Sequence, residues 1–258
     1  MIGAIAGDII GARFERYPIK TTEFHFIPST ACFTDDTVLT IAVAHSILTD
    51  TDFATSLKSF AQKYHFLPYG MHFKKWMWSW EDIPYNSYGN GSAMRVSPVG
   101  FAYDSIDEVL LHAKRSAEVT HNHPEGIKGA QATALSIFLA RKGETKEIIR
   151  NNISKKFNYD LDRTVDEIRP IYEFDISCQG SVPESIVAFL DSEDYEDSIR
   201  KVISLGGDSD TMACITGGIS QAYYKTIPST VVDCVRNGLP KDLLDVMDEF
   251  NIRYGCKY

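Results

Sequence analysis

Hydrophobic positions recur at helical spacing along most of the chain. Between residues 124 and 142 the apolar side chains form one stripe with this period, and Pro124 suits the first turn of the predicted helix. Residues 35–49 and 105–119 show the same period, with Ser105 as a suitable N-cap for the second. The pattern predicts further helices at residues 52–65, 144–157, 183–190, 196–205, 211–224 and 241–254.

Strand-like alternation is scarce, and the best case is the short stretch 23–27. The chain of 258 residues has no repeat of fixed period, no low-complexity tract and no long Pro/Gly linker. We therefore expect a compact all-α fold in which residues 1–258 form one domain. The oligomeric state is left open, since a chain of this size can be monomeric.

The first predicted helix, residues 2–14, carries Gly3, Gly7 and Gly11 on one face. Glycine costs roughly 1 kcal/mol relative to alanine inside a helix. Three glycines at this spacing therefore predict that the backbone of another helix packs closely against this face.

Composition and charge exclude several classes of protein. The net charge is −9, and the densest basic stretch is only Lys155-Lys156, so we expect no nucleic-acid partner. No segment has the roughly 18 consecutive apolar residues that span a bilayer, and we expect no membrane partner. Five scattered cysteines, never in a CxxC pair, argue against a disulfide framework and favour the reducing cytoplasm: Cys32, Cys178, Cys214, Cys234 and Cys256.

Two acidic clusters each stand at the start of a predicted helix. The first is Thr34-Asp35-Asp36-Thr37, and the second is Gly206-Gly207-Asp208-Ser209-Asp210-Thr211. Each pattern alone is typical of an N-cap with a compensating first turn. Carboxylates beside hydroxyls are also the hard oxygen ligands that Mg²⁺ prefers, while the acidic residue expected in an EF-hand loop is missing after the second cluster.

The two clusters together favour a metal site. They offer four carboxylates and two hydroxyls, which suits two divalent cations that polarise a substrate oxygen and activate a water molecule. Without metal the packed carboxylates would repel one another. We expect the clusters to face each other across a cleft, although sequence spacing alone does not bring them together.

A glycine-rich loop and a histidine motif are candidates for substrate binding. The loop 85–95 contains Ser87-Tyr88-Gly89-Asn90-Gly91, a composition typical of a connecting loop but also of loops whose backbone N–H groups bind phosphate. The Tyr88 ring could stack on a base or ribose. His121 and His123 lie two residues apart, but no nearby Cys or His completes a zinc site, so we expect hydrogen bonding rather than zinc ligation.

In this order the motifs resemble those of the ADP-ribosylglycohydrolase family, which includes the dinitrogenase-reductase-activating glycohydrolase. Any one motif is weak, but five in the family's order, from Gly3 to about residue 224, are specific. The matching stretches are residues 3–15, Phe33-Thr34-Asp35-Asp36-Thr37, residues 88–95, Thr120-His121 and Gly206-Gly207-Asp208-Ser209-Asp210-Thr211.

The resemblance implies an all-α fold with two Mg²⁺ ions, or Mn²⁺ in some members, and implies a role for each matching residue. Glu15 matches a glutamate near the metals that positions water or gates the site, and His121 a histidine that contacts the nucleotide. Asp8 is expected to have a local structural role. The family's metal-ligand positions correspond to Thr34, Asp35, Asp36, Asp208, Asp210 and Thr211. The family's loop that holds the diphosphate and ribose corresponds to Ser87, Tyr88, Gly89, Asn90 and Gly91.

The implied activity is hydrolysis of the glycosidic bond between ADP-ribose and a protein or small-molecule acceptor, with ADP-ribose as product. Asp36 or Glu15 would act on the water as general base. Two alternatives remain: a family member that binds ADP-ribose without cleaving it, and a two-metal phosphohydrolase that would release AMP.

The acceptor is not determined by the sequence, since family members act on arginine, serine, poly(ADP-ribose) or other linkages. Loops around the cleft would select it, and the candidates are residues 16–32 and the aromatic stretch 65–85. Trp76, Trp78 and Trp80 in that stretch suit either core packing or an exposed rim.

Overall fold

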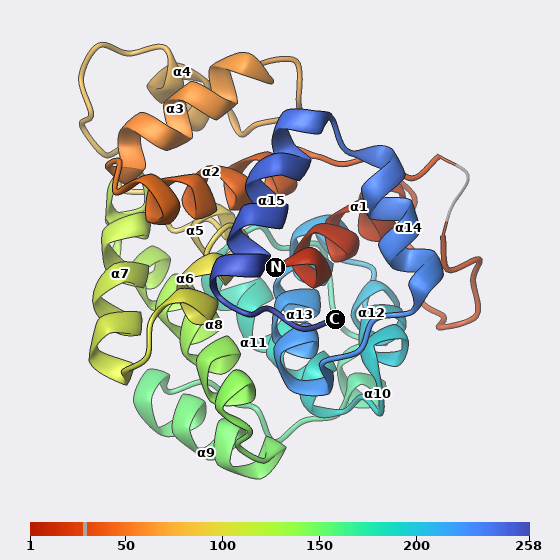
Figure 1. Cartoon of the computed structure of the whole chain (residues 1–258). Helices are drawn as coiled ribbons and strands as arrows, with labels where there is room; N and C mark the ends of the chain where they lie inside the picture. The colour runs from red at the N-terminus through yellow and green to blue at the C-terminus, as the bar shows by residue number, and fades with distance from the viewer. Residues whose placement is uncertain (28–29) are drawn as a thin grey trace.

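The computed structural model describes residues 1–27 and 30–258; Pro28 and Ser29, inside the predicted acceptor loop 16–32, lie outside the described residues. Helices dominate the described part of the chain (Figure 1). Their bounds are α1 (Ile2–Arg16), α2 (Asp35–Thr49), α3 (Phe53–Lys63), α4 (Met71–Met77), α5 (Gly91–Met94), α6 (Ser97–Ala102), α7 (Ile106–Glu118), α8 (Pro124–Lys142), α9 (Lys146–Phe157), α10 (Val165–Ile168), α11 (Cys178–Leu190), α12 (Tyr195–Ile203), α13 (Ser209–Tyr224), α14 (Ser229–Gly238) and α15 (Lys241–Arg253).

The predicted all-α class is confirmed, and α2 and α8 have the predicted bounds. One predicted start is wrong: α11 begins at Cys178 rather than at residue 183, because Pro183 lies inside the helix and not in its first turn. Five helices were not predicted. Four of them, α4, α5, α6 and α10, span only four to seven residues, too few to show a hydrophobic period, and the fifth, α14, buries only Val231 and Val235.

The strand-like alternation at 23–27 does not form a strand, and no partner strand lies beside it among the described residues. The backbone carbonyls of Thr22 and Phe24 accept hydrogen bonds from Arg200 Nη1 at 3.1 and 2.8 Å. The guanidinium of Arg200 also lies over the Phe24 and Phe26 rings, 5.0 and 4.9 Å from their centroids. The alternation that suggested a strand therefore presents two phenylalanines to one arginine.

The glycine face of α1 packs against α13, which confirms the predicted close approach (Figure 1). A Cβ atom at Gly3 would lie 2.5 Å from the Gly217 carbonyl oxygen, and one at Gly11 would lie 2.7 Å from Asp210 Cα. No side chain fits at either position. Because α1 and α13 touch through their backbones, residues at the start of α13 are held at a fixed distance from the polar residues of α1.

Helix α13 is the centre of the hydrophobic core. All of its residues from Ser209 to Ala222 are buried, and α1, α8, α11 and α12 pack around it. The amino end of α13 meets the amino end of α2 beside α1, so the fold brings the two acidic clusters together. Within the described residues, no helix is both long and apolar enough to cross a lipid bilayer.

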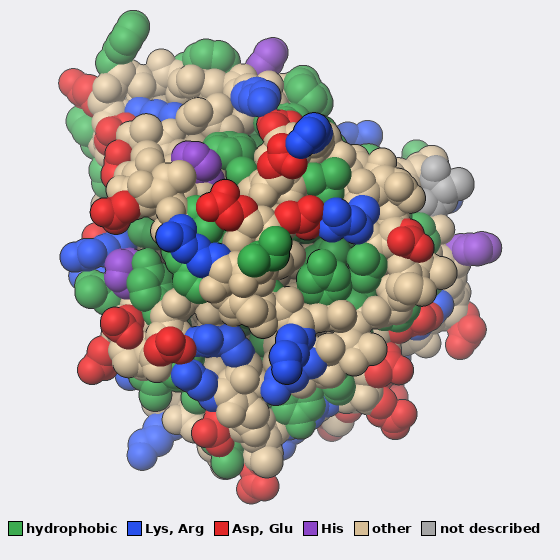
Figure 2. Space-filling view, in the orientation of Figure 1, with side chains coloured by type: hydrophobic (Ala, Val, Ile, Leu, Met, Phe, Trp, Pro, Cys, Tyr) green, Lys and Arg blue, Asp and Glu red, His purple; other side chains and the backbone are tan. Residues whose placement is uncertain are grey.

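The aromatic stretch 65–85 forms a lobe with α3 and α4 at the top of Figure 1. Trp76 is buried in the core, whereas Trp78 is 58% and Trp80 fully exposed. Core packing therefore explains the first tryptophan only. Hydrophobic side chains project from the lobe in Figure 2, in which acidic and basic groups are interspersed over the rest of the visible face.

Candidate metal centre

Asp8 joins α1 to the start of α2. Its buried carboxylate accepts hydrogen bonds from the backbone N–H and hydroxyl of Thr34, at 2.9 and 2.7 Å, and from those of Thr37, at 3.1 and 2.5 Å. Two of these four bonds satisfy backbone N–H groups that the first turn of a helix leaves without partners, and the other two hold the hydroxyls of Thr34 and Thr37. The local structural role predicted for Asp8 is confirmed.

The first acidic cluster has the cap that its sequence predicts. Thr34 is the N-cap of α2, and its hydroxyl oxygen accepts a hydrogen bond from the Asp36 N–H at 3.2 Å. The Asp36 side chain is buried, and its Oδ1 atom has no hydrogen-bond partner among the described residues. A buried carboxylate oxygen without a donor is costly, and a metal ion would supply the missing partner.

The second acidic cluster turns sharply into α13. Gly206 has a φ of +70°, a conformation that favours glycine, and Asp208 is the N-cap of α13 without a side-chain cap bond. The Asp208 carboxylate instead accepts a hydrogen bond from Asn90 Nδ2 at 2.8 Å. This bond ties the glycine-rich loop to the carboxylates.

Five carboxylates meet in two overlapping groups. Asp8, Asp36 and Asp210 form one, and Glu15, Asp208 and Asp210 form the other; within each group the oxygen atoms lie within 4.8 Å of one another. Asp210 belongs to both groups and is the point at which they meet. The two clusters that were far apart in sequence therefore do converge, and α1 adds a carboxylate to each group.

The electrostatics of this site favour a bound cation. Burial raises the pKa of Asp36 well above its ordinary value, and the neighbouring charges of Asp8 and Asp35 raise it further. Burial likewise raises the pKa of Asp210, as do the charges of Asp36 and Asp208, and it raises the pKa of Glu15, helped by Asp208. Divalent cations would neutralise this repulsion, so the residues present fit a metal centre.

Three predicted ligands lie beside these groups without belonging to them. The Asp35 carboxyl is only partly buried at the edge of the site, and burial together with the charge of Asp8 raises its pKa to about 7. The Thr34 hydroxyl lies 3.4 Å from Asp36 Oδ2, and Thr211 is buried at the start of α13.

The glycine-rich loop lies between two other segments. Ser87 N–H donates to the Thr120 carbonyl at 3.4 Å, and Asn90 N–H donates to the Ile176 carbonyl at 2.8 Å. Gly89 N–H donates to the Ser87 hydroxyl at 3.1 Å. Three of the N–H groups that could hold phosphate are thus used within the protein. The Tyr88 side chain, in contrast, is 53% exposed and accessible to a ligand.

His121 faces this loop. Its side chain is 6% exposed, and a Cβ atom at Gly91 would lie 3.1 Å from His121 Nε2. Burial lowers the pKa of His121 well below its ordinary value, and the charge of Arg95 lowers it further, so the ring is neutral at pH 7. His123 instead caps α8, since its Nδ1 accepts from Glu125 N–H at 3.1 Å. Neither histidine is in the two groups of potential metal ligands found among the described residues.

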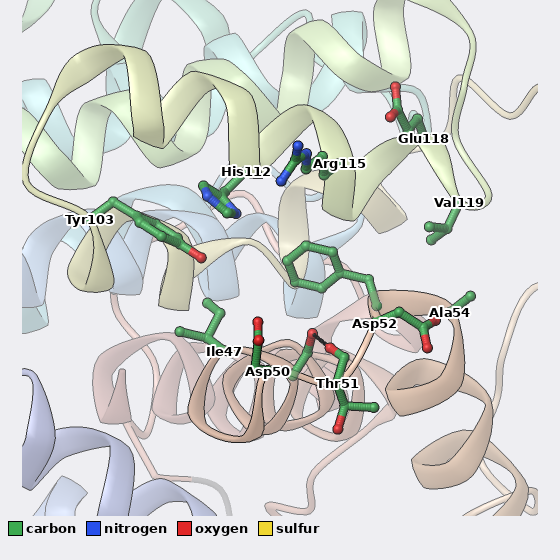
Figure 3. A pocket seen from close by; sticks show the side chains of 12 residues that line it. Ile47, Asp50, Thr51, Asp52, Ala54, Tyr103, His112, Arg115, Glu118 and Val119 are labelled. Atoms are coloured by element: carbon green, nitrogen blue, oxygen red, sulfur yellow. Dashed lines mark hydrogen bonds between the residues drawn. The ribbon is translucent and has the colours of Figure 1, made fainter.

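A separate cavity of about 400 Å³ lies between α7 and the link from α2 to α3 (Figure 3). His112, Arg115 and Asp50 line it, and the His112 ring stacks on Tyr103 with 3.8 Å between centroids. None of the predicted site residues lines this cavity.

Sequence reasoning missed two residues at the site. Asp8 was assigned a structural role only, although its carboxylate lies among the potential ligands. Arg95 was quoted only as the end of a motif, although its side chain is fully buried beside the glycine-rich loop. A charged residue inside an otherwise apolar run, such as Asp8, is a signal that could have identified the first.

Comparison with known proteins identifies the family. The profile of the ADP-ribosylglycohydrolase family matches residues 1–256. The chain is 28% identical to ADP-ribosylhydrolase ARH3 of Gallus gallus, over 87% of this chain and 84% of that protein, and 27% identical to the Homo sapiens ARH3 over 87% and 84%. A solved structure described as an ADP-ribosylglycohydrolase-related protein complex superposes with a TM-score of 0.72 at 22% identity, covering 95% of this chain and 94% of that one. The fold is therefore shared, and the family predicted from the motifs is confirmed. The chain belongs to the ADP-ribosylglycohydrolase family of glycosyl-bond hydrolases.

Proposed function

We propose that this protein is a Mg²⁺-dependent hydrolase that cleaves the glycosidic bond between ADP-ribose and an acceptor. The observation that carries the proposal is the pair of carboxylate groups that meet at Asp210, on a chain of this family. A site with this many buried acids and an unpaired Asp36 oxygen is suited to hard divalent cations.

Two Mg²⁺ ions, or Mn²⁺ in their place, would be held by the two clusters. The proposed ligands are Thr34, Asp35, Asp36, Asp208, Asp210 and Thr211, with the Asp8 carboxylate holding Thr34 in place. When bound, the ions would supply Lewis-acid polarisation of substrate oxygens and a lowered pKa for a bound water.

Glu15 and Asp36 are the proposed groups for handling the water proton. Glu15 is half-buried at the end of α1, and its raised pKa brings it closer to the neutral range in which a general base works best. Asp36 has an oxygen without a hydrogen-bond partner in the part of the chain that the structure describes. Cleavage of a glycosidic bond passes through an oxocarbenium-like state, which the surrounding carboxylates would stabilise.

The remainder of ADP-ribose would lie along the glycine-rich loop. Ser87, Tyr88, Gly89, Asn90 and Gly91, with His121, are proposed to bind the diphosphate and the adjoining ribose. Asn90 supports this assignment because its side-chain amide already contacts Asp208 of the metal centre. Binding energy from this remote part of the substrate would hold the anomeric carbon at the carboxylates.

The test is a panel of substrates modified on arginine, on serine and with poly(ADP-ribose), each incubated with the protein in Mg²⁺ or in EDTA. We expect free ADP-ribose in Mg²⁺ only, and the cleaved member identifies the linkage. Release of AMP would instead indicate a phosphohydrolase. ADP-ribose binding without release from any member would indicate a binding protein.

A further inference from the structure

Arg95 carries a charge that the core does not neutralise. Its side chain is fully buried, and among the described residues its Nε and Nη1 atoms have no hydrogen-bond partner. Burial lowers its pKa to about 10, which leaves the guanidinium charged at neutral pH. A buried charge of this kind requires a compensating arrangement of neighbouring dipoles.

One atom of this guanidinium makes two hydrogen bonds. Arg95 Nη2 donates to the Ser116 carbonyl at 2.8 Å and to the Thr120 hydroxyl oxygen at 2.8 Å. Both hydrogens of Nη2 are thereby used. The Thr120 oxygen acts as an acceptor toward Arg95 and keeps its own single proton for another partner.

That partner is the neighbouring histidine. A hydrogen bond of 2.7 Å joins Thr120 Oγ1 to His121 Nδ1. If the Thr120 hydroxyl donates this hydrogen bond, His121 Nδ1 is unprotonated and the single proton of the neutral ring is on Nε2. This arrangement is electrostatically favoured, because the bare nitrogen is the negative end of the imidazole dipole and then points toward Arg95.

The other ring nitrogen faces the glycine-rich loop. Cβ atoms at Gly91 and Gly89 would lie 3.1 and 3.7 Å from His121 Nε2, and this nitrogen makes no hydrogen bond to any residue that the structure describes. A proton on Nε2 would therefore be offered to a ligand held against these two glycines.

We infer that Arg95 and Thr120 are positioning residues that hold His121 as the Nε2–H tautomer and so present a neutral hydrogen-bond donor to an oxygen acceptor on the substrate. Only the identity of that acceptor, an oxygen of the diphosphate or ribose, rests on the proposed function. The tautomer itself is a property of the ligand-free protein.

Among the residues that the structure describes, Tyr85 provides a competing arrangement. Its ring lies 6.0 Å from the His121 ring. Burial raises the pKa of Tyr85 to about 12, against the opposing effects of the Arg95 charge and of a hydrogen bond with Thr120. If the Thr120 proton went to Tyr85, His121 would have to donate from Nδ1 and Nε2 would be bare. Tyr85→Phe removes this competitor and serves as the matched control.

The test is the ¹⁵N spectrum of the ligand-free protein labelled at histidine, with His121 signals assigned by their loss in His121→Gln. We expect the Nε2–H tautomer in the wild type, in Tyr85→Phe and in Thr120→Ser, and a loss of this preference in Thr120→Val. A wild-type signal from the Nδ1–H form would overturn the inference, whether or not any variant folds.

Binding of ADP-ribose in Mg²⁺ gives the second readout. Loss of one neutral hydrogen bond should weaken binding about 2- to 10-fold in Thr120→Val, with affinity recovered in Thr120→Ser. Equal affinity in Thr120→Val and wild type would contradict the role in binding. Failure of the wild type to bind ADP-ribose would overturn the proposed function instead, and the tautomer measurement would still decide whether the Arg95–Thr120–His121 chain holds the Nε2–H form.

Discussion

Substituting Gly11 by alanine should damage both the core and the metal centre. The added Cβ would clash most closely with the Ser209 carbonyl oxygen, and it would lie 2.7 Å from Asp210 Cα and 2.8 Å from Ser209 C. Ordinary van der Waals contact begins at 3.4 Å, so the two helices must separate by at least about 0.7 Å at this point. Backbone atoms cannot rotate away as a flexible side chain can, and the shift therefore moves Asp210 itself.

The expected loss of stability follows from two opposing effects. Overpacking of a tight contact costs about 3 kcal/mol at the upper end of the usual range. The higher helix propensity of alanine offsets about 1 kcal/mol of this cost. The net loss of about 2 kcal/mol should lower the melting temperature of a chain of roughly this size by about 4–8 °C.

Thermal unfolding with and without Mg²⁺ measures both effects. Metal–ligand distances tolerate only about 0.2 Å of change, so Gly11→Ala should also lose the stabilisation that Mg²⁺ gives the wild type. Gly238→Ala is the matched control, because its Cβ would meet nothing within 4 Å. A Gly11→Ala protein that melts with the wild type and responds equally to Mg²⁺ would refute this account of the α1–α13 contact.

Three further predictions concern charge. Asp36→Asn should raise the melting temperature of the metal-free protein, since it removes one charge from the group of mutually repelling carboxylates. It should also abolish the stabilisation by Mg²⁺. A melting temperature in EDTA below that of the wild type would contradict this prediction. The folded-state pKa of Asp35 is raised from 3.8 to about 7. Denaturant unfolding in EDTA should therefore show the free energy of unfolding falling as the pH rises from about 4 to about 7, and Mg²⁺ should oppose this fall at the higher pH. A free energy of unfolding that rises over this pH range would count against the prediction. Arg163→Ala should lower the free energy of unfolding in urea by about 1–3 kcal/mol, because it leaves the buried Glu184 without two 2.9 Å hydrogen bonds. The control Lys241→Ala breaks an exposed ion pair and should lower it by less than about 1 kcal/mol. Equal losses in the two variants would refute the distinction between the buried and the exposed ion pair.

The parts of the fold that were predictable from sequence are those with strong local signals. Helix α8 has a long apolar period and is followed by the C-cap Gly143, whose φ is +87°, and α2 begins at a Thr-Asp-Asp cap. The glycines of α1 correctly indicated a close helix contact, but not that α13 is the partner. That choice depends on tertiary packing.

The errors in the prediction have the same origin. Residues 23–27 alternate like a strand, yet a strand requires a partner, and Arg200 takes the place of that partner. The two acidic clusters were expected to face each other from the count of ligands, but their meeting at Asp210 and the contribution of Asp8 were not. Its carboxylate enters the site because the α1–α13 contact places it there, which local sequence cannot show.

The proposed site assignments are tested most directly by measuring the release of ADP-ribose from a cleavable modified substrate. The release is measured as Mg²⁺ is added to the wild type and to Asp210→Asn. Asp210 is the residue that both carboxylate groups share, and Asp233→Asn, on the exposed surface of α14, is the control. The account predicts release that requires Mg²⁺ in the wild type and the control, and no release from Asp210→Asn. A folded Asp210→Asn protein that releases ADP-ribose at the wild-type rate, or wild-type release unaffected by EDTA, would contradict it.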